Sequence, residues 1–407
     1  MCEKVTMEND IIVVGAGPCG SFSALTAAKL GAKVTVFEEH PVIGAPSHCA
    51  GHLSLSGLKR LGLELPPFLI ENMFKSAIFF SPSGKQFSVN FSSPVTCVVN
   101  RELFDRYLAE IASNTGARFF LGSRVKGLIQ QKNLTKGVIV HKRDRIEKIM
   151  CNIVIDAEGN PSKILKNAGL KQPKNRIFVK AVSAEVNNIK DVENDRVEVY
   201  LDNKVADGFY AWIIPKRNGT AKIGLATRRG NPKQCLEQFL RKHKIASVKL
   251  RKSQITGLSF HLIPLGGPIS KTFADGLLIV GDAASQVKPT TGGGIITGLT
   301  CAETAGKIAT QAVREGNYSE SFLKRYEEQW RQKIGFDMKT MLFARKLLNN
   351  LSNREVDKLF DIATKLRLEE TLVQVKDVDF QGKELLRVAR RPSAFTALAY
   401  FLFFAIT

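Results

Sequence analysis

Paired cysteines are absent from this sequence. The chain has seven cysteines, an odd number, and no two of them form a CxxC pair. This spacing argues against a disulfide framework, a zinc site and a cysteine-ligated iron–sulfur cluster, so we predict no metal site. We expect reduced thiols and a cytoplasmic protein. The seven are Cys2, Cys19, Cys49, Cys97, Cys151, Cys235 and Cys301.

Acidic residues are also scarce. The chain has 38 Asp and Glu against 59 Lys and Arg, a formal net charge of +21. Residues 121–180 alone carry 14 basic and 4 acidic residues. Such an excess favours an anionic partner. Zinc-finger spacing, recognition-helix signals and RNA-binding signatures are missing, so we expect no nucleic acid. Anionic lipid headgroups fit better, and a solvated surface that maintains solubility is the alternative.

Long apolar runs are few. No signal-peptide core precedes Asp10, and the most apolar segment is AFTALAYFLFFAIT at residues 394–407. As a helix, this segment reaches ~21 Å, short of the ~30 Å hydrocarbon core of a bilayer. We therefore expect peripheral binding at the cytoplasmic face of a membrane, with the segment lying in the interface or inserting partway into the bilayer. A helix buried against the protein, or a dimer contact, is the alternative.

Aromatic usage is skewed, because 25 Phe accompany only 6 Tyr and 2 Trp. A Phe-rich core and a deep apolar ligand pocket explain this equally well. The 407 residues exceed the ~250–300 at which one core stops growing, so at least two domains are expected.

A glycine-rich turn opens the chain. Residues 10–15 form an apolar run typical of a buried strand, a helix is expected from about 20 to 30, and residues 34–37 predict a second strand. Between the first strand and the helix lies Gly15-Ala-Gly17-Pro18-Cys-Gly20. The first glycine allows the turn, the second lets a pyrophosphate approach, and the third lets helix pack on strand. Glu38 ends the second strand, where a carboxylate can bind a ribose diol.

A second glycine-rich segment lies late in the chain. A strand at 277–280 leads into Gly281-Asp282, and Gly292-Gly293-Gly294-Ile295 begins a helix that is expected to run to about Glu315. These features resemble the aromatic-hydroxylase superfamily of FAD-binding flavoproteins, so FAD is the expected cofactor. The resemblance implies that Asp282 binds near the ribityl chain or pyrophosphate, and that the helix start faces the flavin N1–O2 edge.

The same resemblance assigns further cofactor contacts. Arg101, at the start of a predicted helix over 101–116, matches a flavin-contacting arginine, and a helix-surface charge is the alternative. Asp156 and Gly159 resemble the second nucleotide-side turn, or are a plain strand–helix turn. Val125 belongs to the same implied set.

The strand types alternate along the chain, which predicts interleaved domains. We expect an α/β fold with a Rossmann-type FAD-binding domain of the aromatic-hydroxylase (GR2) type at 1–75, 99–176 and 265–318. An antiparallel-sheet substrate domain is expected at 76–98 and 177–264, with a hairpin at 76–90. Residues 319–407 are expected to form a C-terminal helical region with an apolar tail.

Two further segments resemble the geranylgeranyl reductase family. They are Pro46-Ser-His-Cys-Ala-Gly51 and Gly208-Phe-Tyr-Ala-Trp-Ile-Ile-Pro-Lys216, in which Ile214 replaces the family's usual Phe. The resemblance runs from about residue 10 to 330. It implies FAD-dependent reduction of geranylgeranyl chains in membrane ether-lipid precursors, and it places Cys49, Ala50 and Gly51 near the isoalloxazine.

The chemistry of an isolated alkene constrains the site. Such a bond is not polarised, so proton transfer must lead or accompany hydride transfer from flavin N5. A thiol is mostly protonated at neutral pH, which makes Cys49 our candidate acid or redox helper, with His48 and His52 as alternative acids. Tyr210 and Trp212 lie two apart on a strand, share one face, and can tolerate a developing cation. A small buried Cys49 and a core aromatic pair are the structural alternatives.

Other functions and the electron donor stay open. An aromatic monooxygenase or halogenase would use the same fold, and a non-catalytic prenyl-lipid carrier would keep it without turnover. The sequence has no second GxGxxG for a dedicated NADPH domain. NAD(P)H, a ferredoxin and a deazaflavin therefore all stay open as the external electron donor. The other expected partners are an isoprenoid lipid substrate and an anionic membrane surface.

Overall fold

The computed structural model describes residues 9–143, 145–171, 178–217, 219–375, 377–388, 390–392 and 396–397. Most of the apolar segment 394–407 therefore lies outside the described residues. The chain divides into two compact, interleaved units. The first unit comprises residues 1–47, 101–177 and 264–338, and the second comprises 48–100, 178–263 and 339–407.

The compact units differ from the predicted division in two respects. Residues 48–75 group with the second unit, because β3 and β4 pair with β7 in a small separate sheet. The predicted C-terminal region is split, because 319–338 groups with the first unit and 339–407 with the second.

A parallel sheet forms the centre of the first unit. Its order is β18-β11-β1-β2-β8, with β17 added antiparallel to β18 at one edge. Residues Ile11–Val14 of β1 are at most 4% exposed, as expected for an apolar strand covered on both faces. The bounds are β1 (Asn9–Val14), β2 (Val34–Phe37), β8 (Arg118–Phe120), β11 (Arg145–Asp156), β17 (Phe273–Ala274) and β18 (Leu277–Ile279).

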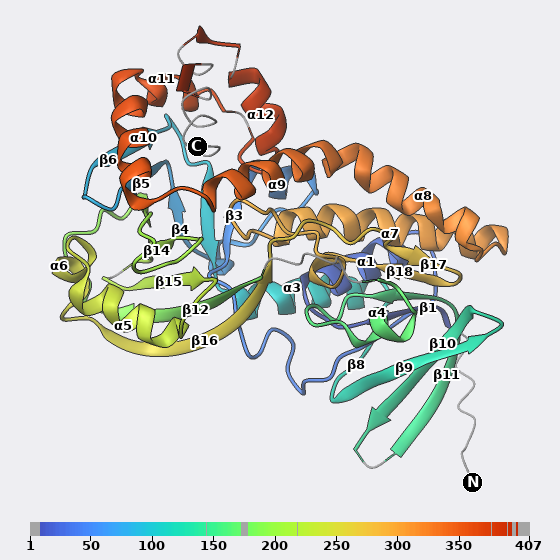
Figure 1. The fold of residues 1–407 in the computed structure, drawn as a ribbon. Helices are drawn as coiled ribbons and strands as arrows, with labels where there is room; N and C mark the ends of the chain where they lie inside the picture. Colours follow the sequence, from blue (N-terminus) through green and yellow to red (C-terminus); the bar gives the residue numbers. More distant parts are fainter. Residues whose placement is uncertain are drawn as a thin grey trace. The chain divides into compact units, whose positions relative to one another are not determined.

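Long antiparallel strands extend this unit. β9 (Ser123–Gln131), β10 (Leu134–Lys142) and β11 form the ribbon seen in Figure 1. Its helices are α1 (Pro18–Lys29), α3 (Arg101–Asn114), α4 (Lys163–Asn167), α7 (Ile295–Glu315) and α8 (Glu320–Trp330).

Helices α1 and α7 pack closely through small residues. A Cβ on Gly298 would lie 2.5 Å from the Sγ of Cys19, and one on Gly306 would lie 2.7 Å from the carbonyl oxygen of Ser23. Any larger side chain at either glycine would push the helices apart. The beginnings of α1 and α7 both follow predicted cofactor turns, so this contact fixes the two turns with respect to each other.

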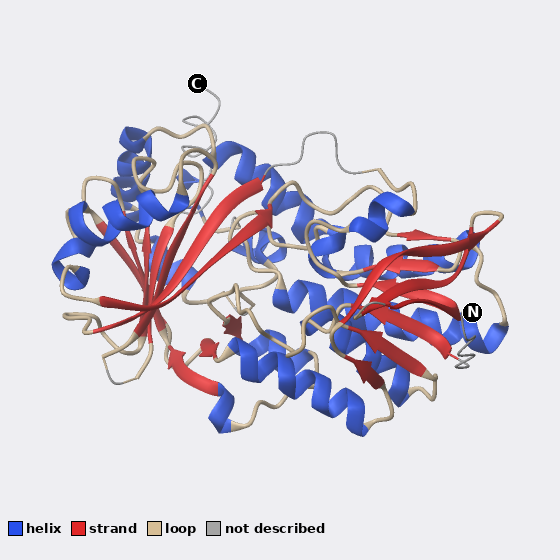
Figure 2. Ribbon diagram, turned by 90° about the horizontal axis from the view of Figure 1, so that it is seen from below, coloured by secondary structure: helices blue, strands red, loops and turns tan. Residues whose placement is uncertain are grey.

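A seven-stranded sheet forms the centre of the second unit. Its order is β16-β12-β15-β14-β13-β5-β6, in which β13 and β5 are parallel and the pairs β12/β15, β15/β14, β14/β13 and β5/β6 are antiparallel. Figure 2 shows its strands as a twisted fan. The bounds are β5 (Ser76–Phe80), β6 (Gln86–Asn90), β12 (Phe178–Asn187), β13 (Arg196–Tyr200), β14 (Ala211–Pro215), β15 (Ala221–Thr227) and β16 (Gln254–Pro264).

Helices cover this sheet where strands were predicted. α5 (Pro232–Lys242) and α6 (Ala246–Leu250) interrupt the strand-rich region, and Phe239 is fully buried in the core that they form with Ile213 and Ile223. The small sheet contains β3 (His52–Ser54), β4 (Ile70–Phe74) and β7 (Thr96–Val99). The remaining helices are α2 (Leu55–Arg60), α9 (Phe336–Leu348), α10 (Asn353–Lys365), α11 (Leu368–Leu372) and α12 (Gln381–Val388). Within the described part of the chain, no helix has the length and hydropathy needed to cross a bilayer.

Candidate active site

The first glycine turn has room only for glycine at two of its three positions. Gly15 has φ +94°, and a Cβ there would lie 2.6 Å from the carbonyl oxygen of Ala157. A Cβ on Gly20 would lie 1.9 Å from the carbonyl oxygen of Gly15. A Cβ on Gly17, by contrast, would meet no atom within 4 Å. The middle glycine therefore faces open space, where a pyrophosphate can approach.

The start of α1 supplies hydrogen-bond donors to that space. The N-cap residue of α1 is Gly17, which has no side chain to cap the helix, and Pro18 occupies the first turn. The unpaired N–H groups and the positive end of the helix dipole then favour an anion. The turn thus fits the phosphates of a dinucleotide.

Glu38 follows β2 and is held by backbone groups. Its Oε2 accepts a hydrogen bond from the Ala16 N–H at 2.8 Å, and its Oε1 accepts one from the His40 N–H at 2.9 Å. The carboxylate therefore braces the glycine turn at the end of the strand, which is the place where a ribose is bound in such folds. Its contact with ribose stays a prediction.

Asp156 ends β11 and points into the protein. Its carboxylate accepts hydrogen bonds from the Glu158 N–H at 3.1 Å and from the Ser162 hydroxyl at 2.8 Å. Burial, and then the nearby charge of Glu158, raise the pKa of Asp156 above its usual range. The side chain stabilises its own turn, whereas Gly159, at φ +82°, has open space beside it.

The second glycine turn brings its predicted residues together. A Cβ on Gly294 would lie 2.9 Å from Oδ1 of Asp282, and one on Gly293 would lie 2.8 Å from Cε of Lys288. Gly292 has φ +70°. Helix α7 begins at Ile295, after the N-cap residue Gly294, which again has no side chain to cap the helix. The turn therefore presents backbone N–H groups beside Asp282, which suits an anionic, polar ring edge.

Arg101 is not a solvated surface charge. It is 12% exposed, and its Nε and Nη2 donate to the two carboxylate oxygens of Asp105 at 3.1 and 3.0 Å. Burial raises the pKa of Asp105 against the opposing effect of Arg101. The guanidinium is thus held in one orientation at the start of α3. The side chain of Val125 is 6% exposed and packs in the core, which leaves only its backbone for a cofactor contact.

Cys49 lies in the second unit, on an exposed loop. Its Sγ accepts a hydrogen bond from the Gly51 N–H at 3.4 Å. The exposure rules out the alternative in which Cys49 is a small buried filler. Burial raises the pKa of the Tyr210 hydroxyl to about 12, the charge of Arg345 acts to lower this pKa, and Cys49 acts to raise it further. Cys49, Tyr210 and Arg345 are therefore near enough to interact electrostatically.

Aromatic rings line this part of the second unit. The rings of Phe209 and Tyr210 stack at 4.3 Å, and Trp212 meets Tyr210 at 5.9 Å with an interplanar angle of 67°. A Cβ on Gly224 would lie 2.4 Å from Cζ2 of Trp212, so the indole lies directly over β15. Its buried Nε1 has no hydrogen-bond partner among the described residues. Such an orphaned donor in an aromatic cluster is consistent with a binding wall.

Arg345 is a residue that the sequence reasoning missed. It is 4% exposed, its Nη1 donates to the Gly208 carbonyl at 3.1 Å, and its guanidinium lies 5.0 Å from the centre of the Phe209 ring. Burial lowers the pKa of Arg345 to about 10, so it is charged at neutral pH. The sequence did contain a signal for its burial. Arg345 lies four residues after Met341 and seven after Met338, which are both 2% exposed, so the helical period places it on the buried stripe of α9.

The two histidines make contacts of their own. The ring of His48 stacks on His261 at 6.0 Å. Nε2 of His52 lies 2.8 Å from the Thr96 hydroxyl, and its ring is nearly perpendicular to the ring of Phe74 at 5.6 Å. His52 is thus oriented by the small sheet, and Cys49 remains the first candidate acid. Among the described residues, no group of three His, Cys, Asp or Glu is arranged to hold a metal ion.

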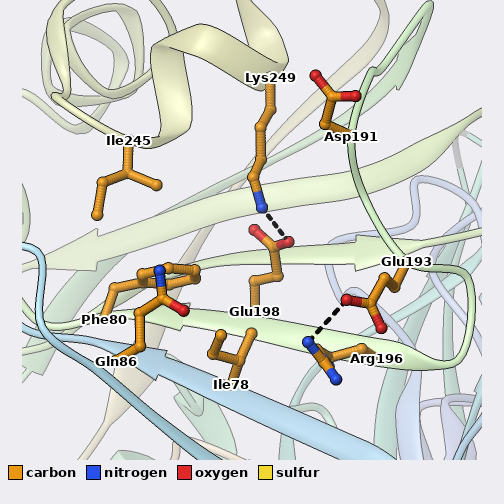
Figure 3. A pocket seen from close by; sticks show the side chains of 9 residues that line it. All are labelled: Ile78, Phe80, Gln86, Asp191, Glu193, Arg196, Glu198, Ile245 and Lys249. Atoms are coloured by element: carbon orange, nitrogen blue, oxygen red, sulfur yellow. Dashed lines mark hydrogen bonds and ion pairs between the residues drawn. The ribbon is translucent and has the colours of Figure 1, made fainter.

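A cavity of about 170 Å³ lies elsewhere in the second unit (Figure 3). Glu198 in its wall is 3% exposed, pairs with Nζ of Lys249 at 2.5 Å, and accepts a hydrogen bond from the Tyr200 hydroxyl. Burial, and then the charge of Glu198, raise the pKa of Tyr200. Arg196 pairs with Glu193 at 2.8 Å. These charges satisfy one another, and none of the predicted site residues lines the cavity.

Comparison with known proteins agrees with this geometry. Residues 8–335 match the model of a family described as FAD binding domain. The chain is 34% identical to digeranylgeranylglycerophospholipid reductase 2 of Methanopyrus kandleri over 95% of this chain and 96% of that protein. It is 37% identical to digeranylgeranylglycerophospholipid reductase of Methanocaldococcus jannaschii over 86% of this chain and 89% of that protein.

Solved structures extend the comparison. A geranylgeranyl bacteriochlorophyll reductase-like protein from Thermoplasma acidophilum is similar with a TM-score of 0.86 and 27% identity, over 97% of this chain and 100% of that one. A p-nitrophenol 4-monooxygenase from Pseudomonas putida has a TM-score of 0.73 at 16% identity, over 93% and 98% of the two chains, and shares the fold alone. The predicted α/β flavoprotein fold is thereby confirmed.

Proposed function

Because the chain belongs to the digeranylgeranylglycerophospholipid reductase family of FAD-binding proteins, we propose that it reduces isolated carbon–carbon double bonds in the geranylgeranyl chains of membrane ether-lipid precursors. The observation that carries the proposal is 34% identity to such a reductase over 95% of this chain, which includes residues of both units. The monooxygenase resemblance is limited to the fold, so no observation favours that alternative.

FAD is the cofactor, and the two glycine turns of the first unit fit it. The start of α1 and the open side of Gly17 would hold the pyrophosphate, and Glu38 the ribose. Asp282 and the start of α7 would hold the ribityl chain and the N1–O2 edge. When bound and reduced, FAD supplies a hydride from N5, and the positive end of α7 favours the negative charge of the reduced ring.

Cys49 is our proposed proton donor. In the reaction, the π bond breaks, one alkene carbon gains the hydride, and the other gains the Cys49 proton. The Cys49 thiolate then regains a proton from water, because the loop that carries it is exposed to solvent. Positive charge develops on the branched carbon before the second C–H bond is complete, and the faces of Tyr210 and Trp212 can stabilise it.

Two partners complete the proposed function. Each alkene reduction oxidises the flavin by two electrons, so an external donor such as NAD(P)H, a ferredoxin or a deazaflavin must supply them. The substrate is a membrane lipid and the chain carries a net charge of +21, which supports peripheral association with an anionic membrane surface.

The test is anaerobic incubation of the FAD-bound protein with digeranylgeranyl phospholipid and dithionite, followed by mass spectrometry of the lipid. We expect a gain of two mass units for each reduced bond. Cys49→Ala should bind FAD normally but lose at least about 100-fold in the rate of a single turnover, the usual contribution of a positioned acid. Cys235→Ala, which removes a partly exposed thiol from α5 of the same unit, is the matched control.

Two results would contradict the proposal at different levels. Unchanged lipid mass with wild-type protein that retains FAD would refute the reductase function. Reduction by Cys49→Ala at the rate of the Cys235→Ala control would leave the function in place but remove Cys49 as proton donor.

A further inference from the structure

Strand β16 presents an apolar face to solvent. Leu258, Phe260 and Leu262 are 41%, 48% and 43% exposed. They alternate along the strand, so their side chains lie on one side of it. β16 is the edge strand of its sheet, beside β12. Soluble proteins seldom leave such a row of large apolar side chains uncovered, and its presence indicates a contact surface.

Basic residues precede this strand in a segment of the chain that has no acidic ones. No Asp or Glu occurs between Glu237 and Asp275. Within this interval, Arg241, Lys242 and Lys244 are exposed at and after the end of α5, and Arg251 and Lys252 are exposed just before β16. Figure 1 shows α5 and α6 beside the beginning of β16.

Two more exposed apolar side chains lie in the same segment. Val248, on α6, is 58% exposed, and Ile255, at the start of β16, is 46% exposed but lies on the other side of the strand from Leu258. The stretch from Arg241 to Leu262, which we call the β16 surface, therefore combines cations and apolar groups. This is the composition that binds the headgroup–acyl boundary of an anionic bilayer.

We propose that the β16 surface docks this protein on an anionic lipid bilayer. The exposed side chains of Leu258 and Phe260 enter the headgroup–acyl boundary, and the flanking cations contact the phosphates. The inference deepens the proposed function and rests on it for the reason to reach a lipid substrate. It assigns membrane binding to a described surface instead of to the apolar C-terminal segment alone.

A second copy of the chain fits this face less well. A second copy on this face would set two segments of the same charge sign against each other, because residues 238–274 of each copy carry basic residues and no carboxylate. Like charges at a strand edge oppose such pairing. Anionic phosphates, in contrast, complement them.

The basic ribbon of the first unit is the rival surface. It carries Lys126 and Lys148, both exposed, and Ile146 is 63% exposed. Glu147 follows Ile146 directly and brings a negative charge to the same strand. We therefore use this ribbon as the matched control for the charge and apolar content of the β16 surface.

The experiment is sedimentation of the FAD-bound, full-length protein with vesicles. One set contains phosphatidylglycerol and phosphatidylcholine in equal parts, and the other contains phosphatidylcholine only. Wild-type protein should sediment with the first set and release at high salt. R251Q/K252Q should bind about 25-fold more weakly, because each cation near an anionic surface contributes about fivefold. Phe260→Ser should bind about tenfold more weakly, because half-exposed aromatic area no longer leaves water.

The controls K126Q/K148Q and Ile146→Ser should sediment like wild type. Urea unfolding of Phe260→Ser checks that a weaker vesicle affinity is not caused by misfolding, and R251Q/K252Q tests the same surface without touching apolar packing. Reduction of detergent-dispersed lipid should be unchanged in the β16 variants. If that activity is absent from wild-type protein as well, the proposed function fails independently of the membrane result.

Three outcomes would overturn the inference. The first is wild-type protein that does not sediment with anionic vesicles. The second is equal sedimentation of wild type, R251Q/K252Q and Phe260→Ser, or an equal loss in the ribbon controls. The third is a dimer in analytical ultracentrifugation that Phe260→Ser dissociates while vesicle binding stays intact, which would make β16 an interface between copies.

Discussion

The contact between Cys19 and Gly298 tests how the two cofactor turns are held together. Cys19 lies in the first glycine turn, and Gly298 lies in the first turn of α7. A Cβ on Gly298 would lie 2.5 Å from Sγ of Cys19, whereas its next neighbour, Cα of Gly281, would be at an ordinary 3.5 Å. The sulfur atom is thus the single obstacle to a larger residue at position 298.

The expected free energies follow from this geometry. Gly298→Ala should lose about 3 kcal/mol by overpacking and regain about 1 kcal/mol of helix propensity, a net loss of about 2 kcal/mol. Cys19→Ala should lose about 1 kcal/mol of buried contact. In the double variant the clash is gone and the propensity remains, so its stability should return to about that of wild type. The coupling energy is then about 3 kcal/mol.

Urea unfolding followed by tryptophan fluorescence gives the four stabilities, and titration with FAD gives the affinities. Gly298→Ala should bind FAD about tenfold more weakly, because the starts of α1 and α7 move apart, and Cys19→Ala should restore binding. Gly306→Ala is the matched control, because its Cβ would meet the Ser23 carbonyl oxygen, which Cys19→Ala cannot relieve. Additivity of Cys19→Ala and Gly298→Ala within about 0.5 kcal/mol would refute the reasoning.

Two further predictions concern buried cations of the second unit. Lys222 is 6% exposed and contacts Oε2 of Glu71 at 2.6 Å, so Lys222→Met should cost about 3 kcal/mol in urea unfolding. Burial acts to raise the pKa of Glu71, but its lysine partners outweigh this and lower it. The stability that this ion pair adds is present above the ordinary carboxyl pKa of 4.5 and is lost as the pH falls through the lower pKa of folded Glu71. The free energy of unfolding of Lys222→Met should therefore fall less steeply with acid than that of wild type. An unchanged dependence of this free energy on pH would contradict the assignment. Arg345→Met should lose about 2 kcal/mol of stability. It should also move the titration of Tyr210, measured by ultraviolet absorbance at alkaline pH, to higher pH, because a neighbouring positive charge is removed. Arg345→Lys keeps the charge and should restore the Tyr210 titration but not the full stability.

Features that depend on neighbouring residues could be predicted from the sequence. The expected strand at 34–37 matches β2, the hairpin at 76–90 matches β5 and β6, and the helix predicted from 101 matches α3. The GxGxxG motif predicted its own turn, because Gly15 is required by a contact with the adjacent strand end and Gly20 by a contact within one strand–helix unit, while Gly17 faces open space. Local spacing and local geometry coincide in these cases.

Helix α5 shows where local evidence was outweighed. Asn231 caps it by accepting from the Lys233 N–H, and Pro232 occupies its first turn, which are both sequence signals for a helix start. The surrounding strands led us to expect a mostly antiparallel region, and the helix was missed. Its apolar residues Leu236 and Phe239 fit a helical stripe that packs on the sheet.

Arg345 shows the limit of sequence reasoning about the site. It follows Gly208 by 137 positions in the chain, and its hydrogen bond to that carbonyl depends on how α9 packs within the second unit. Likewise, the inward direction of the Asp156 side chain depends on Ser162 and on its complete burial. A motif identifies residue types at a turn, but it does not say which side chains face the ligand and which hold the turn together.

The alternation of chain segments between the two units has a consequence for synthesis on the ribosome. The first unit needs residues up to 338, and the second needs residues beyond them. The amino-terminal strand and the first glycine turn therefore cannot complete their packing until most of the polypeptide has been translated. A nascent chain halted before Gly281 would have no second cofactor turn, and neither half of this protein could be expressed separately as a working flavoprotein.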